Sequence, residues 1–102
     1  MARVRRTKAA RQDLKRIGRF VANESRSLSV ALKLVDSIAV RCEHYASRPL
    51  MGEACPDLGH EIRRFVFRNY AVYYRPTTDG IDVLRVLHAS RDIPTAWREP
   101  LD

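Results

Sequence analysis

The hydrophobic pattern of this chain changes its period once, and that change constrains the fold more than any other feature. Between residues 8 and 46 the apolar residues recur every three or four positions, which predicts helices. Between residues 61 and 88 they form short strand-type runs separated by turn residues. One change of period without an internal repeat predicts an α+β fold, with a single domain over residues 1–102.

Two helices are expected in the first half of the chain. Thr7 is a suitable N-cap for the first helix, which ends near residues 23–25, and Ser27 or Ser29 can cap the second. Pro49 stops the second helix. The short connection predicts an antiparallel helical hairpin. The apolar face of the first helix comprises Ala10, Leu14, Ile17 and Val21, widened by Phe20, and that of the second runs from Leu28 to Ala46.

Three strands are expected in the second half, at residues 61–67, 70–75 and 81–88. The tight turn at 68–69 and the Asp-Gly turn at 79–80 predict an antiparallel three-stranded meander. The remaining segments are a possible first strand at 2–6, at an edge or the centre of the sheet, an ordered loop at 47–59, and a short tail at 89–102 that is helical or irregular. The predicted core places Leu14, Ile17, Leu32, Val35 and Ile38 against Phe65, Val72 and Val83.

The net charge of +7 comes entirely from the first quarter of the chain. Residues 1–26 hold nine Lys and Arg against two acids, whereas residues 27–102 hold ten of each sign. This clustering makes the first helix amphipathic and cationic, which predicts a partner with an acidic binding segment. The cations expected to bind that segment are Lys8, Arg11, Lys15 and Arg19.

Several classes of protein are excluded by composition. No run approaches 18 apolar residues, so no membrane span is expected, and the basic N-terminus lacks the apolar region of a secretory signal. Cys42 and Cys55 do not have the spacing of a zinc site, and the three histidines form no ligand set. No glycine-rich phosphate loop is present. We therefore expect a reduced, cytoplasmic protein without a metal or a cofactor.

Cations and aromatic residues alternate along the predicted sheet, and two interpretations stay open. The pattern suits a nucleic-acid surface, and it equally suits an ordinary outer face of a sheet. His88 is a candidate acid–base group because imidazole titrates near neutral pH, although a lone histidine at a strand end is more often a hydrogen-bonded scaffold residue. The residues concerned are Arg63, Arg64, Arg68 and Arg75 with Tyr70, Tyr73 and Tyr74.

A family resemblance covers nearly the whole chain. It is carried by Ala10, Asp13-Leu14, Ile17, Pro49-Leu50-Met51-Gly52, Leu58-Gly59, Ile62-Arg63, Tyr70, Tyr73-Tyr74-Arg75, Asp79-Gly80-Ile81 and the run 85–92. These residues resemble the RelE/ParE toxin superfamily, and the run from Tyr74 onward is most similar to the ParE branch. The resemblance implies that the N-terminal strand exists and pairs into the sheet ahead of the helical hairpin.

The resemblance implies a bacterial toxin of a type II toxin–antitoxin system, of the kind associated with plasmid stabilisation. ParE-type members inhibit DNA gyrase by protein contact, whereas RelE-type members are endoribonucleases that cleave mRNA on the ribosome. Tyr70-Ala71 stands where nucleases of the family tend to carry an arginine, and no lysine follows Lys33. Trp97 cannot replace an acid–base residue, because an indole N–H does not titrate. These departures favour a gyrase inhibitor that is not an enzyme.

Each interpretation assigns its own residues. A gyrase inhibitor would contact its target through Arg63, Arg85, Arg91 and Trp97, and a ribosome-dependent nuclease would use His88, Arg91, Arg63 and Arg85. Both toxins imply a hetero-oligomer with a cognate antitoxin. A third alternative, suggested only by the charge, is a simple nucleic-acid-binding module.

Overall fold

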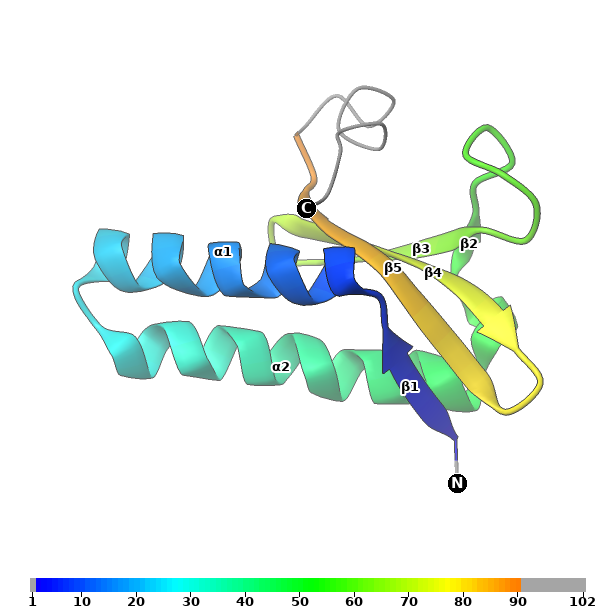
Figure 1. The fold of residues 1–102 in the computed structure, drawn as a ribbon, viewed down its shortest axis with the longest axis horizontal. Helices are drawn as coiled ribbons and strands as arrows, with labels where there is room; N and C mark the ends of the chain where they lie inside the picture. The colour runs from blue at the N-terminus through cyan, green and yellow to red at the C-terminus, as the bar shows by residue number, and fades with distance from the viewer. Residues whose placement is uncertain (1, 91–102) are drawn as a thin grey trace.

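The computed structural model describes residues 2–90 and consists of a helical hairpin packed on one face of a five-stranded sheet (Figure 1). The elements are β1 (Arg3–Arg6), α1 (Lys8–Ser25), α2 (Leu28–Ser47), the 3-10 turn η1 (Pro49–Met51), β2 (Glu53–Ala54), β3 (Arg63–Phe67), β4 (Tyr70–Thr77) and β5 (Gly80–His88). The predicted α+β class and the order of strand, hairpin and meander are confirmed.

Both helices begin at the predicted caps. The Thr7 hydroxyl accepts the Ala10 N–H at 3.0 Å, and the Ser27 hydroxyl accepts the Val30 N–H at 3.1 Å. Each bond satisfies one of the backbone donors that a helix N-terminus leaves unpaired. Arg26 ends α1 in the left-handed region with φ 55, so the chain reverses within two residues and the helices lie antiparallel.

The sheet is mixed, whereas the sequence predicted an antiparallel meander with one added strand. Its order is β1-β5-β4-β3-β2, and the meander β3-β4-β5 is antiparallel as expected. The two edge strands, β1 and β2, differ from the prediction. β1 lies at one edge and runs parallel to β5, and the chain between them contains the helical hairpin and the other three strands. β2 lies at the other edge, within the segment expected to be a loop, and pairs antiparallel with β3.

Local backbone geometry explains the remaining differences in the strands. β3 begins at Arg63, two residues later than predicted, and Glu61 just before it has φ 61, which is incompatible with an extended strand. The 68–69 turn forms as expected, and Arg68 adopts a positive φ of 55 in it. At Gly80 a Cβ would collide with the backbone of Arg3. Glycine at this position therefore lets β1 lie directly beside β5.

The exposed edge of β5 beyond β1 is completed by the start of α1. The Thr7 N–H donates to the Val83 carbonyl at 3.0 Å, and the Thr7 hydroxyl donates to the Leu84 carbonyl at 2.8 Å. The Val86 N–H donates to the Asp13 carboxylate at 2.9 Å. Side chains of α1 thus satisfy backbone groups that would otherwise leave an open strand edge.

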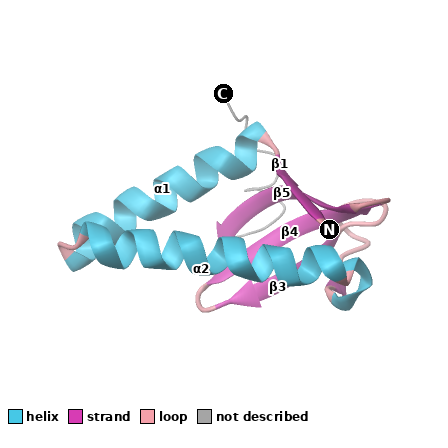
Figure 2. Ribbon diagram, turned by 90° about the horizontal axis from the view of Figure 1, so that it is seen from below, coloured by secondary structure: helices cyan, strands magenta, loops and turns pink. Residues whose placement is uncertain are grey.

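The main core lies between the helical hairpin and the sheet, and one predicted core residue is wrong. Ile17, Ile38, Phe65, Val72 and Val83 are buried, while Leu14 and Val35 are half-buried. Leu32 is 60% exposed although its neighbour Ala31 is 2% exposed, so Leu32 lies outside the buried face of α2, near the joined end of the hairpin that extends past the sheet (Figures 1 and 2). Phe20, expected to widen the inner face of α1, is also 60% exposed.

The predicted tail lies outside the described residues from position 91 onward. Within residues 2–90, no helix is both long enough and apolar enough to cross a membrane.

Candidate functional site

The outer side of α1 carries a row of cations, here called the cationic face, formed by Lys8, Arg11, Lys15 and Arg19. All four side chains are exposed. Among the described residues, no acid lies within ion-pair distance of them. Arg11 instead donates to the Arg6 carbonyl at 2.6 Å. The structure therefore brings the four predicted antitoxin-binding residues onto one solvent-facing surface.

The cationic face includes Lys8, whose position in the first turn of α1 is electrostatically unfavourable for the helix. The first turn of α1 contains Lys8 and no acid. Backbone N–H groups make a helix N-terminus partly positive, so a cation there destabilises the helix. In contrast, two of the three cations of β1 are compensated, because Arg3 lies 3.8 Å from Asp79 and Arg5 lies 3.2 Å from Asp79 and 3.7 Å from Asp82. The hydrogen bond from Arg5 lowers the pKa of the Asp79 carboxyl below its ordinary value.

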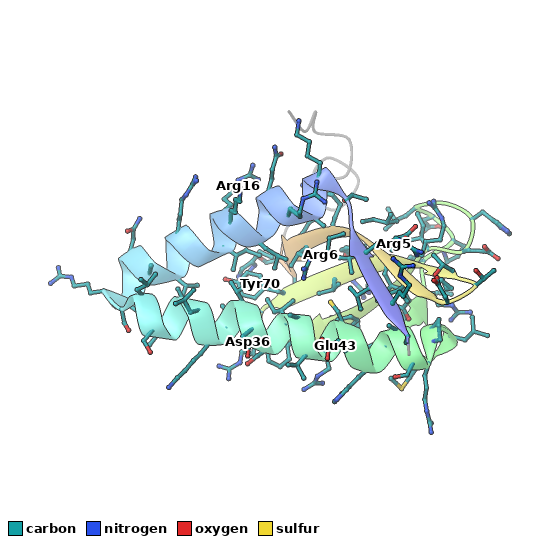
Figure 3. The ribbon with its side chains drawn as sticks, turned by 60° about the horizontal axis from the view of Figure 1, so that its bottom comes forward. Arg5, Arg6, Arg16, Asp36, Glu43 and Tyr70 are labelled. Carbon is teal, nitrogen blue, oxygen red and sulfur yellow. The ribbon has the colours of Figure 1, made fainter. Side chains whose placement is uncertain are left out.

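Along α2 runs a hollow of about 780 Å³, here called the apolar groove, whose apolar lining is Leu28, Leu32, Val35 and Ala39. Leu28 and Leu32 are 68% and 60% exposed, which is unusual for neighbouring leucines on one helix. Polar and charged residues complete the lining: Ser29, Lys33 and Asp36. α2 carries two acids, Asp36 and Glu43, against two cations, Lys33 and Arg41, so it lacks the cationic excess of α1 (Figure 3). An apolar strip with a polar rim has the composition of a protein interface.

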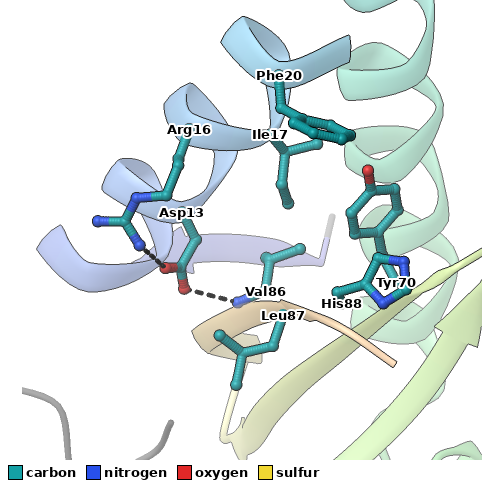
Figure 4. Close-up of a pocket in the computed structure, with 8 residues that line it drawn as sticks. All are labelled: Asp13, Arg16, Ile17, Phe20, Tyr70, Val86, Leu87 and His88. Atoms are coloured by element: carbon teal, nitrogen blue, oxygen red, sulfur yellow. Dashed lines mark hydrogen bonds and ion pairs between the residues drawn. The ribbon is translucent and has the colours of Figure 1, made fainter. Parts of the chain in front are cut away.

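A second, smaller pocket of about 270 Å³ lies between α1 and the end of β5 (Figure 4). Its apolar lining comprises Ile17, Phe20, Tyr70, Val86 and Leu87, with His88 at the strand end and Asp13 and Arg16 on α1. The ring of Tyr70 meets that of His88 edge-on, with 5.7 Å between centroids.

Asp13 joins α1 to β5 through a buried ion pair. Its carboxylate accepts from Arg85 Nε at 2.8 Å and from Arg85 Nη2 at 3.1 Å, in addition to the Val86 N–H. Asp13 is 2% exposed and Arg85 is 3% exposed. A bidentate contact of this kind fixes the orientation of both the carboxylate and the guanidinium. The expectation that Arg85 is a surface residue is therefore wrong, and its guanidinium holds α1 to the sheet.

The other sheet cations and tyrosines are also mostly structural. Arg63 donates to the carbonyls of Gly52 at 2.8 Å and Leu50 at 3.2 Å. Tyr70, Tyr73 and Tyr74 are at most 9% exposed, so their rings are unavailable for base stacking. The Tyr74 hydroxyl accepts from the Gly52 N–H and donates to the Pro49 carbonyl, which anchors the segment between α2 and β3. Burial raises the pKa of this hydroxyl.

Among the candidate nuclease residues that the structure describes, His88 and Arg63 do not come together. His88 pairs with Tyr70 across β4–β5, while Arg63 pairs with Tyr74 across β3–β4. Four residues along β4 separate the two positions by roughly 13 Å, and they lie on opposite sides of that strand. The Nδ1 atom of His88 accepts from the Ser90 N–H at 3.2 Å and lies 2.6 Å from the Ser90 hydroxyl. Arg91 and Trp97 lie outside the described residues.

The cysteines and acids show no sign of a metal centre in the described range. No group of three His, Cys, Asp or Glu within residues 2–90 could hold a metal ion. Cys42 is buried in the main core, and burial raises the pKa of its thiol to about 11. It is therefore a small core residue, as predicted from its place in the apolar stripe.

The profile of the family described as "ParE toxin of type II toxin-antitoxin system, parDE" matches residues 4–93. The chain belongs to this ParE toxin family. A solved structure described as "Chromosomal ParDE TA system from P. aeruginosa" has the same fold, with a TM-score of 0.73 and 20% identity over 88% of this chain and 98% of that chain. No curated protein sequence matches this ParE-family chain.

Sequence reasoning missed two features of this ParE-family structure. The first is the Asp13–Arg85 pair, for which a lone acid on the inner face of a cationic helix was the available signal. The second is the apolar groove, because the period of α2 does not distinguish residues over the sheet from residues beyond it.

Proposed function

We propose that this chain inhibits DNA gyrase by direct protein contact and that a cognate antitoxin with an acidic segment neutralises it in a hetero-oligomer. The observation that carries the proposal is the outer surface of the helical hairpin. The cationic face runs along α1 from its sheet end, the apolar groove runs along α2 from the joined end, and both are open to solvent. A toxin acting on gyrase would work in the bacterial cytoplasm.

The antitoxin would use the two surfaces differently. Apolar side chains buried in the apolar groove would supply most of the binding free energy, as interface hot spots do. Acidic side chains would meet the cationic face, which speeds association and sharpens specificity more than it raises affinity.

The arrangement of the sheet residues supports gyrase inhibition over the alternative, ribosome-dependent mRNA cleavage. A nuclease needs its acid–base and phosphate-binding groups around one substrate position. Arg85 is engaged by Asp13, Arg63 is engaged by backbone carbonyls, and His88 lies at the other end of the sheet from Arg63. Among the proposed target-binding residues, this leaves Arg91 and Trp97, which follow His88 in the chain.

The decisive experiment replaces His88 by Gln, which keeps a hydrogen-bonding side chain but removes the titration. Supercoiling by purified gyrase and cleavage of ribosome-bound mRNA would be measured in parallel. We expect His88→Gln to block supercoiling as well as the parent chain does, and neither protein to cleave mRNA. A nuclease dependent on His88 would instead lose about 10²–10⁴ in rate. Cleavage by the parent that disappears in a folded His88→Gln variant would replace the gyrase proposal by the nuclease.

The antitoxin contact has its own test. Reversing Lys8, Arg11 and Arg19 to Glu should slow association with the cognate antitoxin, most strongly at low salt where charges are least screened. Arg48→Glu/Arg75→Glu is a charge-changing control on exposed residues outside α1. An association rate unchanged at low salt in the α1 variant would contradict the assignment.

A further inference from the structure

The cationic face has a composition that a protein partner alone does not explain. Its cations recur at every third or fourth residue of α1 over three helical turns. The positions interspersed on the same side are Gln12, Ala22 and Asn23, none of which offers a large apolar side chain. Phe20, the exposed aromatic residue of α1, lines the pocket beside Tyr70 and His88 instead. The surface therefore offers charge with almost no apolar area.

The geometry of the cationic face is that of a straight row. At a rise of 1.5 Å per residue, the eleven steps from Lys8 to Arg19 extend roughly 16 Å along the helix axis. α1 is continuous over this range, and one side of it faces away from both α2 and the sheet (Figures 1 and 2). A rigid, regularly spaced row of cations matches a ligand whose negative charges are themselves regularly spaced.

We propose that the cationic face of α1 binds the phosphate backbone of double-stranded DNA when the toxin is free of antitoxin. Affinity comes from release of the cations condensed on the duplex, which needs charge but no apolar contact. The acids of α2, Asp36 and Glu43, face a different surface, and because α2 as a whole has no excess positive charge, α1 is the helix that turns toward the duplex. The antitoxin's acidic segment then competes with DNA for the same four cations.

B-form DNA fits this surface better than an RNA duplex does. An exposed α-helix of ordinary diameter can approach the wide major groove of B-DNA, with its side chains reaching the phosphates of the flanking strands. The major groove of A-form RNA is too deep and narrow for such an approach. The proposal also explains why α1 keeps Lys8 at an N-terminus where a cation is unfavourable.

The number of cations fixes the expected salt dependence. Four phosphate contacts give a slope of about −3.6 in a plot of the logarithm of the association constant against that of the salt concentration. Binding should therefore weaken on the order of 100-fold between about 50 and 200 mM salt. It should not depend on base sequence, because backbone contacts carry no sequence information.

The test is fluorescence anisotropy of a short labelled DNA duplex titrated with purified toxin, with neither gyrase nor antitoxin present. Lys15→Glu/Arg19→Glu removes two contacts and should halve the slope, with an affinity loss on the order of 100-fold at low salt. Arg48→Glu/Arg75→Glu makes the same change in net charge outside α1 and should alter affinity by no more than about threefold. Circular dichroism and thermal melting establish that both variants are folded.

Each outcome of the anisotropy experiment either supports or contradicts the proposal. The proposal is supported if only the α1 variant loses affinity and salt dependence, and if a matched RNA duplex binds more weakly than the DNA duplex. No binding by the parent at low salt, an equal loss in the control variant, or equal affinity for the RNA duplex overturns it. Because gyrase is absent from this assay, its result stands apart from the supercoiling experiment, and failure of either proposal leaves the other testable.

Discussion

The two ends of the helical hairpin are built from one continuous amphipathic pattern but have opposite environments. At the end that lies on the sheet, Ile38, Cys42 and Ala46 of α2 are at most 3% exposed. At the joined end, Leu28, Val30 and Leu32 of the same helix are 48–68% exposed. α1 shows the same division, since Ala10 is buried whereas Phe20 is not.

The comparison indicates that the apolar residues of one helix contribute both to the core and to an exposed surface. Where strands lie beneath it, the apolar stripe forms the core and determines stability. Toward the joined end, apolar residues of α2 also line the apolar groove, whose exposure to solvent is typical of an interaction surface. Substitutions in the two regions should therefore have separable effects, on folding at one end and on partner binding at the other.

The largest effect is expected for Asp13 at the packed end. Asp13→Ala would leave the buried guanidinium of Arg85 and the Val86 N–H without the carboxylate that holds them. Breaking one partner of a buried ion pair typically costs about 3–5 kcal/mol. Urea denaturation should show this loss. A variant with an unshifted midpoint would show that the pair is not needed to hold α1 to the sheet.

The second-largest effect is expected from a comparison of alanine substitutions at two aliphatic residues of α2. Ile38→Ala should lower the free energy of unfolding by about 2–5 kcal/mol, because it leaves a cavity in the main core. Leu32→Ala should change it by less than about 0.5 kcal/mol, since the side chain is already in solvent. Leu32→Ala should instead weaken antitoxin binding, measured by calorimetry. Equal losses of stability in the two variants would contradict the difference between the two ends of the helical hairpin.

A pH-dependent effect is expected from Cys42, also at the packed end. Its pKa is raised to about 11 from the model-compound value of 9.0, so above pH 9 the thiol ionises more readily in the unfolded chain. Stability is therefore unaffected below pH 9 and falls by about 2–3 kcal/mol as pH rises toward 11. Comparing the pH dependence of unfolding with that of Cys42→Ala isolates this contribution. Parallel curves for the two proteins would exclude it.

The smallest effect concerns the cationic face and has the opposite sign. Lys8→Glu should stabilise the protein by about 0.3–1 kcal/mol, because an acid suits the first turn of α1 better than a cation. The same change should weaken binding of the proposed acidic and nucleic-acid partners. Thermal melting at low salt measures the first effect. A lower melting temperature would mean that Lys8 has a stabilising contact of its own.

Much of this fold could be predicted because its signals are local. The Thr7 and Ser27 caps, the Asp-Gly turn and the meander all follow from residues within a few positions of each other. The parallel pairing of β1 with β5 could not be derived this way, since its partners are far apart in sequence and β1 has little apolar content. The family resemblance implied that the strand exists but did not place it at the edge.

The candidate site was predicted less completely, for a related reason. Exposed cations on α1 follow directly from helical periodicity, and all four are where the pattern put them. Burial of Arg85 depends on Asp13, which lies 72 positions earlier and pairs with it only in the folded chain. Leu32 lies next to the buried Ala31 but lines the apolar groove, and the apolar periodicity of α2 alone did not separate the buried face from this flank.

The pairing of β1 with β5 also governs the order in which this protein can be assembled. Arg3 lies beside Gly80 in the finished sheet, so β1 can pair only after the chain has been synthesised as far as β5. The helical hairpin consists of near-neighbour contacts and can form early, whereas closing the sheet requires a loop of more than seventy residues. During synthesis the chain therefore passes through a stage with a formed hairpin and no completed sheet, and the anchoring of α1 to β5 is among the final steps of folding.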